Sequence, residues 1–528
     1  MEGNEHSMEY RVWRMEGKIR DTSSPARHTP YAIRHTRRAS RGVTIMLVIA
    51  FMGIFAVLMG TISSYVFQQA KYGRALFGRE QAINIAEAGL EYYRWFLAHN
   101  PSILVNGTGL VSPYTYPVND PEAGAVGEAT VTAAANLQCG AVQWIDLAST
   151  GVSDSAPGFP RTLEARYLKS SVAEYSYILN SNVWQGSDVV GPYHSNGGIR
   201  MDGASNSNVT SKVSTWTCTY SYGCSPSQSK PGIFGAGTGY NLWSYPAADI
   251  SFESMAVNFS TLKTYAQTSG IYLSPTAAYV AGVQQGSSYS SVGSDDKHGY
   301  RIVFRSDGKV DVYRVTQTSG VSSIHIDNTS QWTTDYHTIV SQTLLTGSPF
   351  ALPSGCSIIY SQAKVWLEGT VKGKITVIAA DTTGVINPDI ILQNNINYAT
   401  GDGTTGLTAM AQHSVLYPLI VPDQMSVRGI FVAQSGYYGR NFYNCYYGGT
   451  NSRRTSLALQ GTVVSNQRPA TKWGYNSLGW GCAGGGSSSD YSGFNTRTTT
   501  YDQILAFSPP PFTPATSVDY KLTMWREK

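Results

Sequence analysis

Residues 43–66 read V-T-I-M-L-V-I-A-F-M-G-I-F-A-V-L-M-G-T-I-S-S-Y-V, and this stretch decides how the chain is organised. It carries no charged side chain. Because a helix rises 1.5 Å per residue, these 24 residues would reach about 36 Å, enough to cross a bilayer core of roughly 30 Å. A buried core helix is the alternative, but such helices are seldom apolar on every face over this length. The sequence therefore predicts a membrane-spanning helix, anchored by side chains that include Val43, Leu47, Phe51, Phe55 and Leu58.

Positive charge is concentrated on the N-terminal side of this stretch. The first 42 residues contain nine Arg or Lys and five Asp or Glu, whereas the rest of the chain has 29 of each, so the leader accounts for the net charge of +4. Basic flanks stay on the cytoplasmic side of a membrane, which predicts a cytoplasmic N-terminus and a single-pass protein with an extracytoplasmic bulk. A protein that binds nucleic acid would need a basic face on its folded domain, whereas the basic excess here lies in the leader. No nucleic-acid partner is therefore predicted.

The helix is expected to continue beyond the membrane. No proline interrupts residues 43–100, and apolar residues recur at helical spacing in the second half, at Ala82, Ala86, Leu90 and Leu97. The apolar run is too long for a removable secretory signal, whose core has about 7–15 residues. We therefore predict one helix over residues 43–98, which spans the membrane at 43–66 and is amphipathic toward its end.

Two motifs in this region resemble those of a known family. Arg41-Gly42 followed by the apolar residues 43–47 resembles a class III prepilin processing site, and Ala86-Glu87-Ala88-Gly89-Leu90 is similar to the signature helix of PilX-type minor pilins. The resemblance implies cleavage between Gly42 and Val43. It also implies partners: prepilin peptidase, other pilins and minor pilins, the inner-membrane assembly machinery and membrane lipid.

One position departs from the major pilins, which carry Glu at the fifth mature residue where this chain has Leu47. A carboxylate within an apolar run is costly unless it is paired, and in major pilins the partner is the N-terminal amine of a neighbouring subunit. A subunit that caps the filament has no neighbour to supply that amine. Leu47 therefore favours a minor subunit, with the filament tip or the initiation of assembly as a candidate position.

The C-terminus widens the resemblance to both ends of the chain. Tyr501-Asp502-x-x-Leu505, the prolines 509–511 and Trp525-Arg526-Glu527 resemble the ending of bacterial pilus-assembly proteins with a PilX-type N-terminus. The function that follows is a minor pilin-like structural subunit of a type IV pilus or pseudopilus, which would reach the cell surface or the pilus after assembly. A surface adhesin with a permanent membrane anchor is the first alternative.

The bulk of the chain has the composition of a mainly-β surface protein. Charged residues make up 14%, below the roughly 25% of an average soluble chain, and there are 53 glycines and 35 tyrosines. We expect five segments: a cytoplasmic basic leader (1–42), a pilin-like helix (43–98), a β-rich pilin-like domain (99–180), a β-rich domain with Ser/Gly/Tyr loops (181–360), and a β-solenoid-like domain with a C-terminal tail (361–528).

A seven-residue pattern predicts the last of these segments. Residues 365–371, 425–431 and 457–463 alternate apolar and other residues around a central Gly, and residues 390–396 match with Asn in the glycine place. Gly and Asn tolerate positive φ and let a strand bend. Stacked short strands with such corners build a β-solenoid, and an ordinary β-sandwich with similar strands is the alternative.

Local patterns elsewhere predict smaller elements. Residues 300–304 and 309–313 read as a hairpin, residues 250–268 as a helix, and residues 203–241 as a surface loop. His194, in His194-Ser195-Asn196-Gly197, is interpreted as a turn residue.

The cysteines suggest cross-links. Of six cysteines, none forms a C-x-x-C pair, and outside the cytosol an even number allows disulfides. Cys218 and Cys224 could close a small loop, and Cys445 and Cys482 a longer one. Free buried thiols are the alternative.

No catalytic, cofactor or metal site is predicted, and the chain is not expected to be an enzyme. A carbohydrate-active solenoid enzyme would need clustered carboxylates, whereas Glu368, Asp381, Asp389 and Asp402 are scattered. Tyr and Trp on polar segments, among them Tyr220, Tyr222 and Trp473, suit contacts with surface glycans or proteins, or else simply cover the solenoid.

Overall fold

The computed structural model describes residues 41–100, 112–122, 124–253, 255, 258–274, 299–327, 329–384, 386–474 and 491–528. The chain divides into two compact units, Met1–Tyr72 and Gly73–Lys528. Residues 1–40 of the expected leader, and Cys482, lie outside the described residues.

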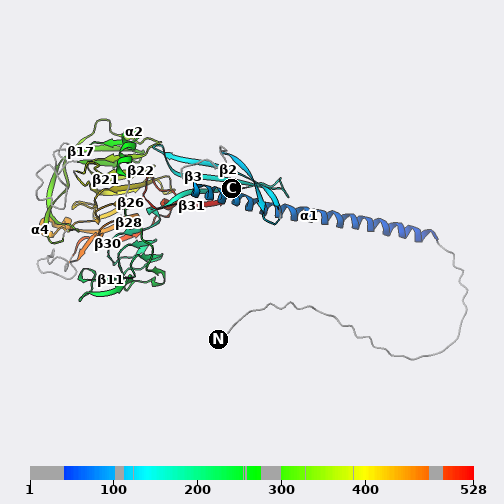
Figure 1. The fold of residues 1–528 in the computed structure, drawn as a ribbon, viewed down its shortest axis with the longest axis horizontal. Coiled ribbons are helices and arrows are strands. Elements are labelled where there is room, and N and C mark those ends of the chain that lie inside the picture. Colours follow the sequence, from blue (N-terminus) through cyan, green and yellow to red (C-terminus); the bar gives the residue numbers. More distant parts are fainter. Residues whose placement is uncertain are drawn as a thin grey trace, which may run out of the picture. The chain divides into compact units, whose positions relative to one another are not determined.

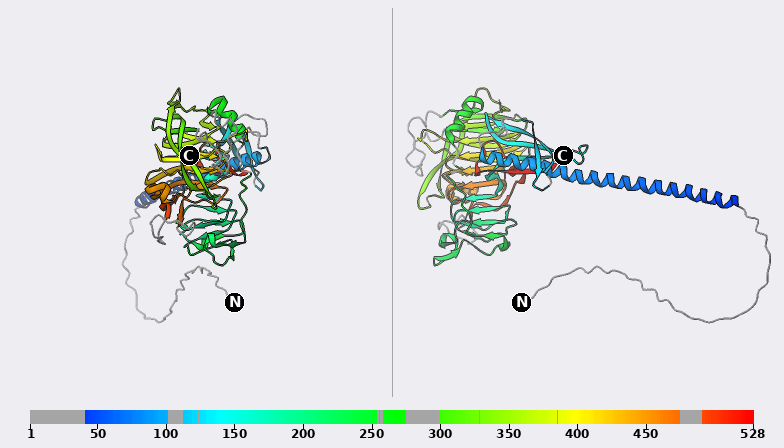
Figure 2. Two further views of the ribbon diagram at one scale, coloured as in Figure 1. Left: turned by 90° about the vertical axis from the view of Figure 1, so that its left-hand side faces the viewer. Right: turned by 45° about the vertical axis from the view of Figure 1, so that its right-hand side comes forward.

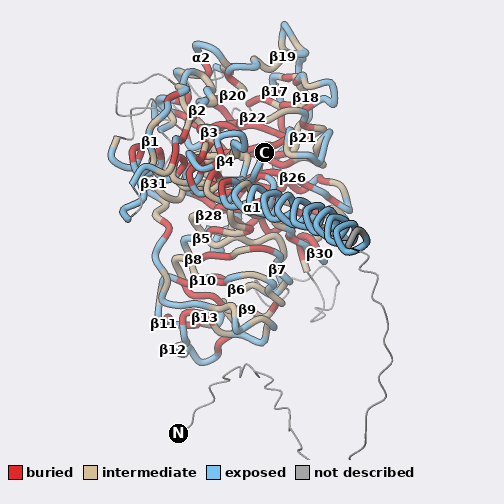
Figure 3. Tube along the Cα trace, turned by 90° about the vertical axis from the view of Figure 1, so that its right-hand side faces the viewer, coloured by how far each residue is buried: buried red, intermediate tan, exposed pale blue. Residues whose placement is uncertain are grey.

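Helix α1 (Arg41–His99) is unbroken over 59 residues. Its side chains are exposed from Val43 to Arg74, and from Gly78 onward one face becomes buried (Figure 3). The first part is long and apolar enough to cross a membrane. This confirms the prediction of one long apolar N-terminal helix followed by a mainly-β region.

The packed part of α1 lies on an antiparallel sheet (Figure 1). The strand order is β1-β2-β3-β4-β31. The bounds are β1 (Tyr114–Asp120), β2 (Gly124–Gln138), β3 (Ala141–Ser153), β4 (Arg161–Ser171) and β31 (Ala515–Glu527). The last strand of the chain therefore completes a sheet that begins about 400 residues earlier, since Leu522 pairs with Tyr167.

Most of the other strands form parallel ladders. One ladder runs β15-β20-β22-β24-β26-β28-β5-β8-β10-β14, each strand parallel to the next. Its strands are β15 (Ile271–Leu273), β20 (Ile358–Ser361), β22 (Lys374–Ala379), β24 (Gly406–Ala411), β26 (Gln424–Ala433), β28 (Arg453–Ser465), β5 (Tyr177–Leu179), β8 (Tyr193–Ser195), β10 (Val209–Ser211) and β14 (Trp243–Ser244).

Further ladders flank the first. They are β16-β21-β23-β25-β27, the pairs β28-β30 and β30-β7, and β6-β9-β13, all parallel. The strands are β16 (Gly299–Phe304), β21 (Lys364–Val371), β23 (Ile390–Tyr398), β25 (Val415–Leu416), β27 (Tyr438–Gly439), β30 (Tyr491–Thr500), β7 (Val189–Val190), β6 (Val183–Gln185), β9 (Ile199–Met201) and β13 (Ile233–Phe234). Figure 2 shows the stacked strands from two more sides.

The repeated segments pair with one another in register. Val365 lies opposite Ile390, and Met425 lies opposite Leu457. Gly429 and Gly461 are also paired, both at positive φ, and a Cβ on Gly461 would lie 2.0 Å from the carbonyl oxygen of Gly429. No side chain fits in that space, so the glycine of the pattern is required where one strand bends over the next. The apolar residues of the pattern meet in one core between the ladders, with Leu367, Leu392, Val427 and Leu459 buried.

Antiparallel hairpins and short helices complete the fold. The remaining strands are β11 (Thr215–Cys218), β12 (Gln228–Pro231), β17 (Lys309–Ile324), β18 (Trp332–Leu344), β19 (Phe350–Ala351) and β29 (Lys472–Gly474). The helices are α2 (Phe259–Ser269), α4 (Cys445–Gly448) and α5 (Gln503–Phe507), with 3-10 turns η1 (Val172–Glu174), η2 (Tyr220–Tyr222), η3 (Tyr240–Leu242) and η5 (Gly449–Ser452).

Several local expectations differ from the structure. The helix expected at 250–268 begins only at Phe259, because the side chain of Asn258 caps it by accepting from the Thr261 amide. The expected loop at 203–241 contains the short strands β10 to β13. The boundary expected between residues 360 and 361 does not separate two sheets, since β16 pairs with β21 and β28 with β5. The hairpin at 300–313 is present as β16 and β17.

Candidate functional site

The signature residues of α1 form the face that packs on the sheet. Ala86, Gly89 and Leu90 are buried, Ala88 is half-buried, and Glu87 is exposed. The neighbouring Leu97 and Tyr93 continue the same buried face. Small residues alternate with large ones on this face, so the helix can lie close to the strands and still fill the core.

Two glycines set how closely the helix approaches β3. A Cβ on Gly151 would lie 2.1 Å from the carbonyl oxygen of Ala82 and 2.6 Å from the amide nitrogen of Ala86. A Cβ on Gly89 would lie 2.1 Å from Oγ of Ser149. Real Cβ contacts are rarely below 3.4 Å, so Gly151, whose obstacles are backbone atoms, has no room for a side chain, and a side chain at Gly89 would require Ser149 to move. The glycine of the signature therefore allows close packing of the helix on β3.

Polar contacts fix the helix along its axis. The Ser153 and Ser155 hydroxyls donate to Oε1 of Gln81 at 2.6 and 3.0 Å, and the Tyr167 hydroxyl donates to the carbonyl oxygen of Arg94 at 3.4 Å. Burial, with the neighbouring Tyr167, raises the pKa of Tyr93 to about 12. The phenol therefore stays neutral at physiological pH within this core.

The expected processing and anchoring residues all lie in the first part of α1. Gly42 and Val43 are its second and third residues, and the Val43 side chain is 64% exposed. The apolar side chains of this stretch are exposed too: Leu47, Phe51, Phe55 and Leu58. Such a continuous apolar surface needs a covering of lipid or of other apolar helices.

A covalent joint links the antiparallel sheet to the ladder region. Cys139, at the turn between β2 and β3, is disulfide-bonded to Cys356, which lies 217 residues further along just before β20. The Cys139 amide donates to the Gly355 carbonyl at 2.7 Å, and the Ser357 amide donates to Oε1 of Gln138 at 3.2 Å. Neither cysteine was among the predicted cross-links, because a separation of this length leaves no signal in the sequence.

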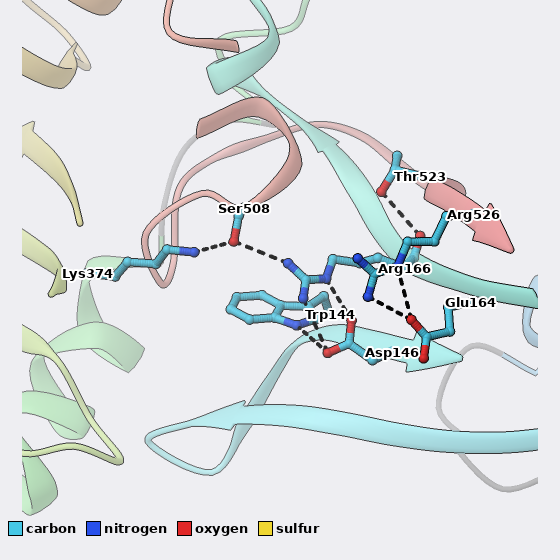
Figure 4. Close-up of polar contacts among 8 residues, drawn as sticks. All are labelled: Trp144, Asp146, Glu164, Arg166, Lys374, Ser508, Thr523 and Arg526. Carbon is cyan, nitrogen blue, oxygen red and sulfur yellow. Dashed lines mark hydrogen bonds and ion pairs between the residues drawn. The ribbon is translucent and has the colours of Figure 1, made fainter. Parts of the chain in front are cut away.

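A polar cluster forms the second part of the joint (Figure 4). Arg166 on β4 donates from Nε and Nη2 to the carboxylate of Asp146 at 2.7 and 3.3 Å, and from Nη1 to the hydroxyl of Ser508 at 3.2 Å. Lys374 of the ladder donates to the same hydroxyl. The guanidinium lies 4.7 Å and the ammonium 5.4 Å from the centre of the Trp144 ring. Two cations from different sheets therefore meet across one hydroxyl and one indole.

The Lys374 ammonium is less basic than usual. Burial, with the nearby Arg166 cation, lowers its pKa to about 8, although Asp146 opposes the change. The joint is thus sensitive to pH in the mildly alkaline range.

The C-terminal segment from Tyr501 to Glu527 crosses the same joint. Asp502 accepts from Nη2 of Arg428 at 2.8 Å, and Leu505 is buried among ladder residues. After the prolines, the Phe512 amide donates to Oε1 of Gln143 on β3 at 2.8 Å. Arg526 then binds Glu164 on β4 at 2.7 Å, and Thr523 donates to the Arg166 carbonyl (Figure 4). The ending of the chain therefore joins the ladders to the sheet.

The expected disulfide cysteines lie away from this joint. Cys218 and Cys224 are bonded to each other across η2. Cys445 is also disulfide-bonded, whereas Cys482 lies outside the described residues.

Glu368, Asp389 and His194 have packing roles, whereas Asp402 is exposed and accepts from Thr404 in its own turn. Glu368 is paired with Arg301, and Asp389 accepts from Nδ1 of His413 at 2.8 Å. His194 lies in strand β8 and not in a turn: it is buried, with Nδ1 2.8 Å from Oγ1 of Thr210 and Nε2 2.9 Å from Oδ1 of Asn196. The described residues contain no group of three His, Cys, Asp or Glu that could hold a metal ion.

The sequence did not predict a buried polar network near β18. Asp335 is fully buried, 2.5 Å from Nδ1 of His337 and 3.1 Å from Nδ2 of Asn441, and it also accepts from the Tyr443 hydroxyl. Burial alone would raise the pKa of this carboxyl, but His337 and these hydrogen bonds hold it well below its usual range. Alternation in β18 could have placed Asp335 and His337 on one face, but not indicated that this face is buried.

Comparisons with known proteins add one finding. No protein-family model and no curated protein matches the chain. Among solved structures, it is similar to the crystal structure of the competence-associated pilin ComZ from Thermus thermophilus, with 12% identity over 85% of this chain and 97% of that chain. The TM-score is 0.27, and at that value the likeness carries no argument about fold or function.

Proposed function

We propose that this protein is a minor pilin-like structural subunit of a type IV pilus or related pseudopilus. The observation that carries the proposal is the division of α1 into two parts. Its first part is apolar and exposed on every side, and its second part packs through Ala86, Gly89 and Leu90 on an antiparallel sheet. A helix built in this way can first span the inner membrane and later pack among the helices of other subunits, while the sheet holds its far end.

The family motifs support this use of the helix. Arg41-Gly42 stands where a prepilin peptidase would cut, directly before the exposed apolar residues. The signature glycine fits this use, because a Cβ at Gly89 would lie 2.1 Å from Oγ of Ser149 and would oppose close packing of the helix on β3. Partners of the mature helix would be other pilins, the inner-membrane assembly machinery and lipid.

A position at the filament tip, or in the initiation of assembly, fits two observations. Leu47 replaces the Glu that would pair with the amine of a subunit above. The ladder region is also large, since it accounts for most of residues 177–500, and a repeating filament would have to accommodate it at every subunit.

We further propose that the parallel ladders form a β-solenoid displayed outward from the membrane. In-register stacking of Met425 on Leu457 and of Gly429 on Gly461 supports this fold over a β-sandwich, which is built from antiparallel sheets. The disulfide between Cys139 and Cys356 and the cluster around Ser508 would hold the solenoid to the pilin-like sheet.

The test is N-terminal mass spectrometry of the protein from hosts with and without prepilin peptidase. We expect a mature N-terminus at Val43 that depends on the peptidase. Gly42→Val should block cleavage because a β-branched side chain replaces the only residue without a Cβ in the site. Gly53→Ala, within the same helix and with nothing within 4 Å, is the matched control and should be cleaved normally. An intact leader in both hosts would refute the pilin proposal and favour a permanently anchored adhesin.

A further inference from the structure

Two adjoining hollows lie where the disulfide-closed turn between Cys218 and Cys224 meets the ladders. The larger has a volume of about 390 Å³ and is lined by both turn and ladder residues. The smaller, of about 70 Å³, shares Trp184 and Ala470 with it. The turn belongs with β11, which Figure 3 places at the end of the ladders away from β20. The larger volume falls within the roughly 300–1,000 Å³ of small-molecule sites.

Aromatic side chains form walls of the larger hollow. Tyr220 and Trp184 are 67% and 42% exposed, whereas Trp473 is almost buried. Trp184 is held in place, because its Nε1 donates to Asp202 at 2.7 Å and the Arg200 guanidinium lies 4.2 Å from its ring centre. The fixed indole of Trp184 and the exposed phenol of Tyr220 are suited to stacking on a flat ligand.

The charge of the lining is positive. Arg468 and Lys472 line the larger hollow and Arg497 the smaller, while no Asp or Glu is among the described lining residues of either. Acids flank the lining without being part of it. Asp202 pairs with Arg200, Asp188 follows Ser187 and accepts from the Ala204 amide at 2.8 Å, and the exposed Asp327 follows Ile326. This local excess of cations stands out because residues 43–528 are neutral overall.

Arg468 and Lys472 are held by neutral oxygens and not by acids: the Lys472 ammonium donates to the carbonyl oxygen and to Oδ1 of Asn495 at 3.0 and 2.9 Å. Arg468 uses Nη2 to bind the Ser221 carbonyl at 3.1 Å, which directs the guanidinium to the turn that closes the hollow. Burial, together with Arg497, lowers the pKa of Lys472. An anion placed among these groups would relieve the repulsion between them and gain charge-assisted hydrogen bonds.

We propose that these hollows form a binding site for an acidic sugar, such as a uronate or sialate unit of a surface glycan. The ring would stack on Tyr220 and Trp184, the carboxylate would meet Arg468 and Lys472, and the hydroxyls of Ser221 and Thr329 would meet those of the sugar. A nucleic-acid strand fits less well, because a backbone-tracking groove needs a continuous basic surface over several nucleotides. The proposal does not depend on the pilin assignment.

Calorimetric titration of the full-length protein in detergent micelles tests this site. The probes are digalacturonate and sialyllactose, with galactobiose and lactose as their neutral counterparts. At least one acid should bind about tenfold or more tightly than its neutral counterpart, because a hydrogen bond to a charged group contributes at least that factor. Tyr220→Ala and Arg468→Gln should each weaken that binding about tenfold.

Two matched control variants test whether the loss of binding is specific to residues that line the hollows. Tyr240→Ala removes a phenol that is 76% exposed, and Lys212→Gln removes an exposed cation, and neither residue lines the hollows. Both should bind as the wild type does. The proposal is overturned if neither acid binds more tightly than its neutral counterpart, or if the controls lose binding equally. It is also overturned if a thymidine oligonucleotide binds more tightly than both acids through Tyr220 and Arg468.

Discussion

The close approach of α1 to β3 predicts a large and local effect of one methyl group. In Gly151→Ala the new Cβ would lie 2.1 Å from the Ala82 carbonyl oxygen and 2.6 Å from the Ala86 amide nitrogen. Both atoms are backbone, so no side-chain rotation relieves the clash and the helix must move outward by about 1 Å to restore ordinary contact. Overpacking of this kind costs about 1–3 kcal/mol. We expect a value near the upper end, about 2–3 kcal/mol.

Hydrogen exchange of the full-length protein in micelles measures this cost where it arises. A loss of 2–3 kcal/mol in local stability corresponds to roughly 30- to 150-fold faster exchange in peptides from β3 and β4. Gly158→Ala is the control, because nothing lies within 4 Å of its added Cβ, and it should change exchange little. Exchange in Gly151→Ala within threefold of the control would refute the close packing of helix and sheet.

The partner position provides a rescue experiment. Gly89→Ala should also destabilise the sheet, but less, because Ala gains about 1 kcal/mol of helix propensity over Gly and its obstacle is the side chain of Ser149. Adding Ser149→Gly removes the Oγ at 2.1 Å and the Cβ at 3.2 Å, so the double variant should recover most of the loss. Failure to recover would show that the signature glycine is not needed for packing.

Two further predictions concern the joint between sheet and ladders. Replacing Cys139 and Cys356 together with Ala should lower the free energy of unfolding by up to about 5 kcal/mol, because the disulfide closes a loop of 217 residues in the unfolded chain. Guanidinium unfolding without reductant measures this loss. A loss below about 1 kcal/mol would contradict a constraining role of the disulfide. The pKa of Lys374 is lowered from 10.5 to about 8, so the folded protein binds fewer protons than the unfolded chain between these values. Its contribution to stability is therefore present above pH 10.5 and is lost as the pH falls through 8. The unfolding free energy of the wild type minus that of Lys374→Met should rise from pH 7.5 to 10. A difference that does not change with pH would refute the lowered pKa of Lys374.

The sequence was most informative where interactions are local or periodic. The apolar run after Gly42 predicted the first part of α1, because a long apolar run without charge or proline predicts a helix without knowledge of distant residues. The repeat around Gly429 and Gly461 predicted stacked short strands, and the structure pairs these two segments in register. The hairpin of β16 and β17 followed from a turn of only a few residues.

The sequence was least informative where distant segments meet. The pairing of Leu522 with Tyr167, and the bond of Cys139 to Cys356, join positions hundreds of residues apart, and no local pattern marks them. The cluster of Arg166, Lys374 and Ser508 draws on three separate segments for the same reason. His194 was placed in a turn because Asn and Gly follow it, although tertiary stacking makes it part of β8.

The central claim is that the first part of α1 carries this protein into a filament of pilins. Quantitative mass spectrometry of filaments sheared from cells and purified tests it most directly, by counting peptides from the ladder region relative to the major pilin. We predict substoichiometric incorporation of a chain that begins at Val43, which is lost in Gly42→Val and retained in Gly53→Ala. Absence from sheared filaments, with the full chain retained in the inner membrane of the same cells, would contradict the account.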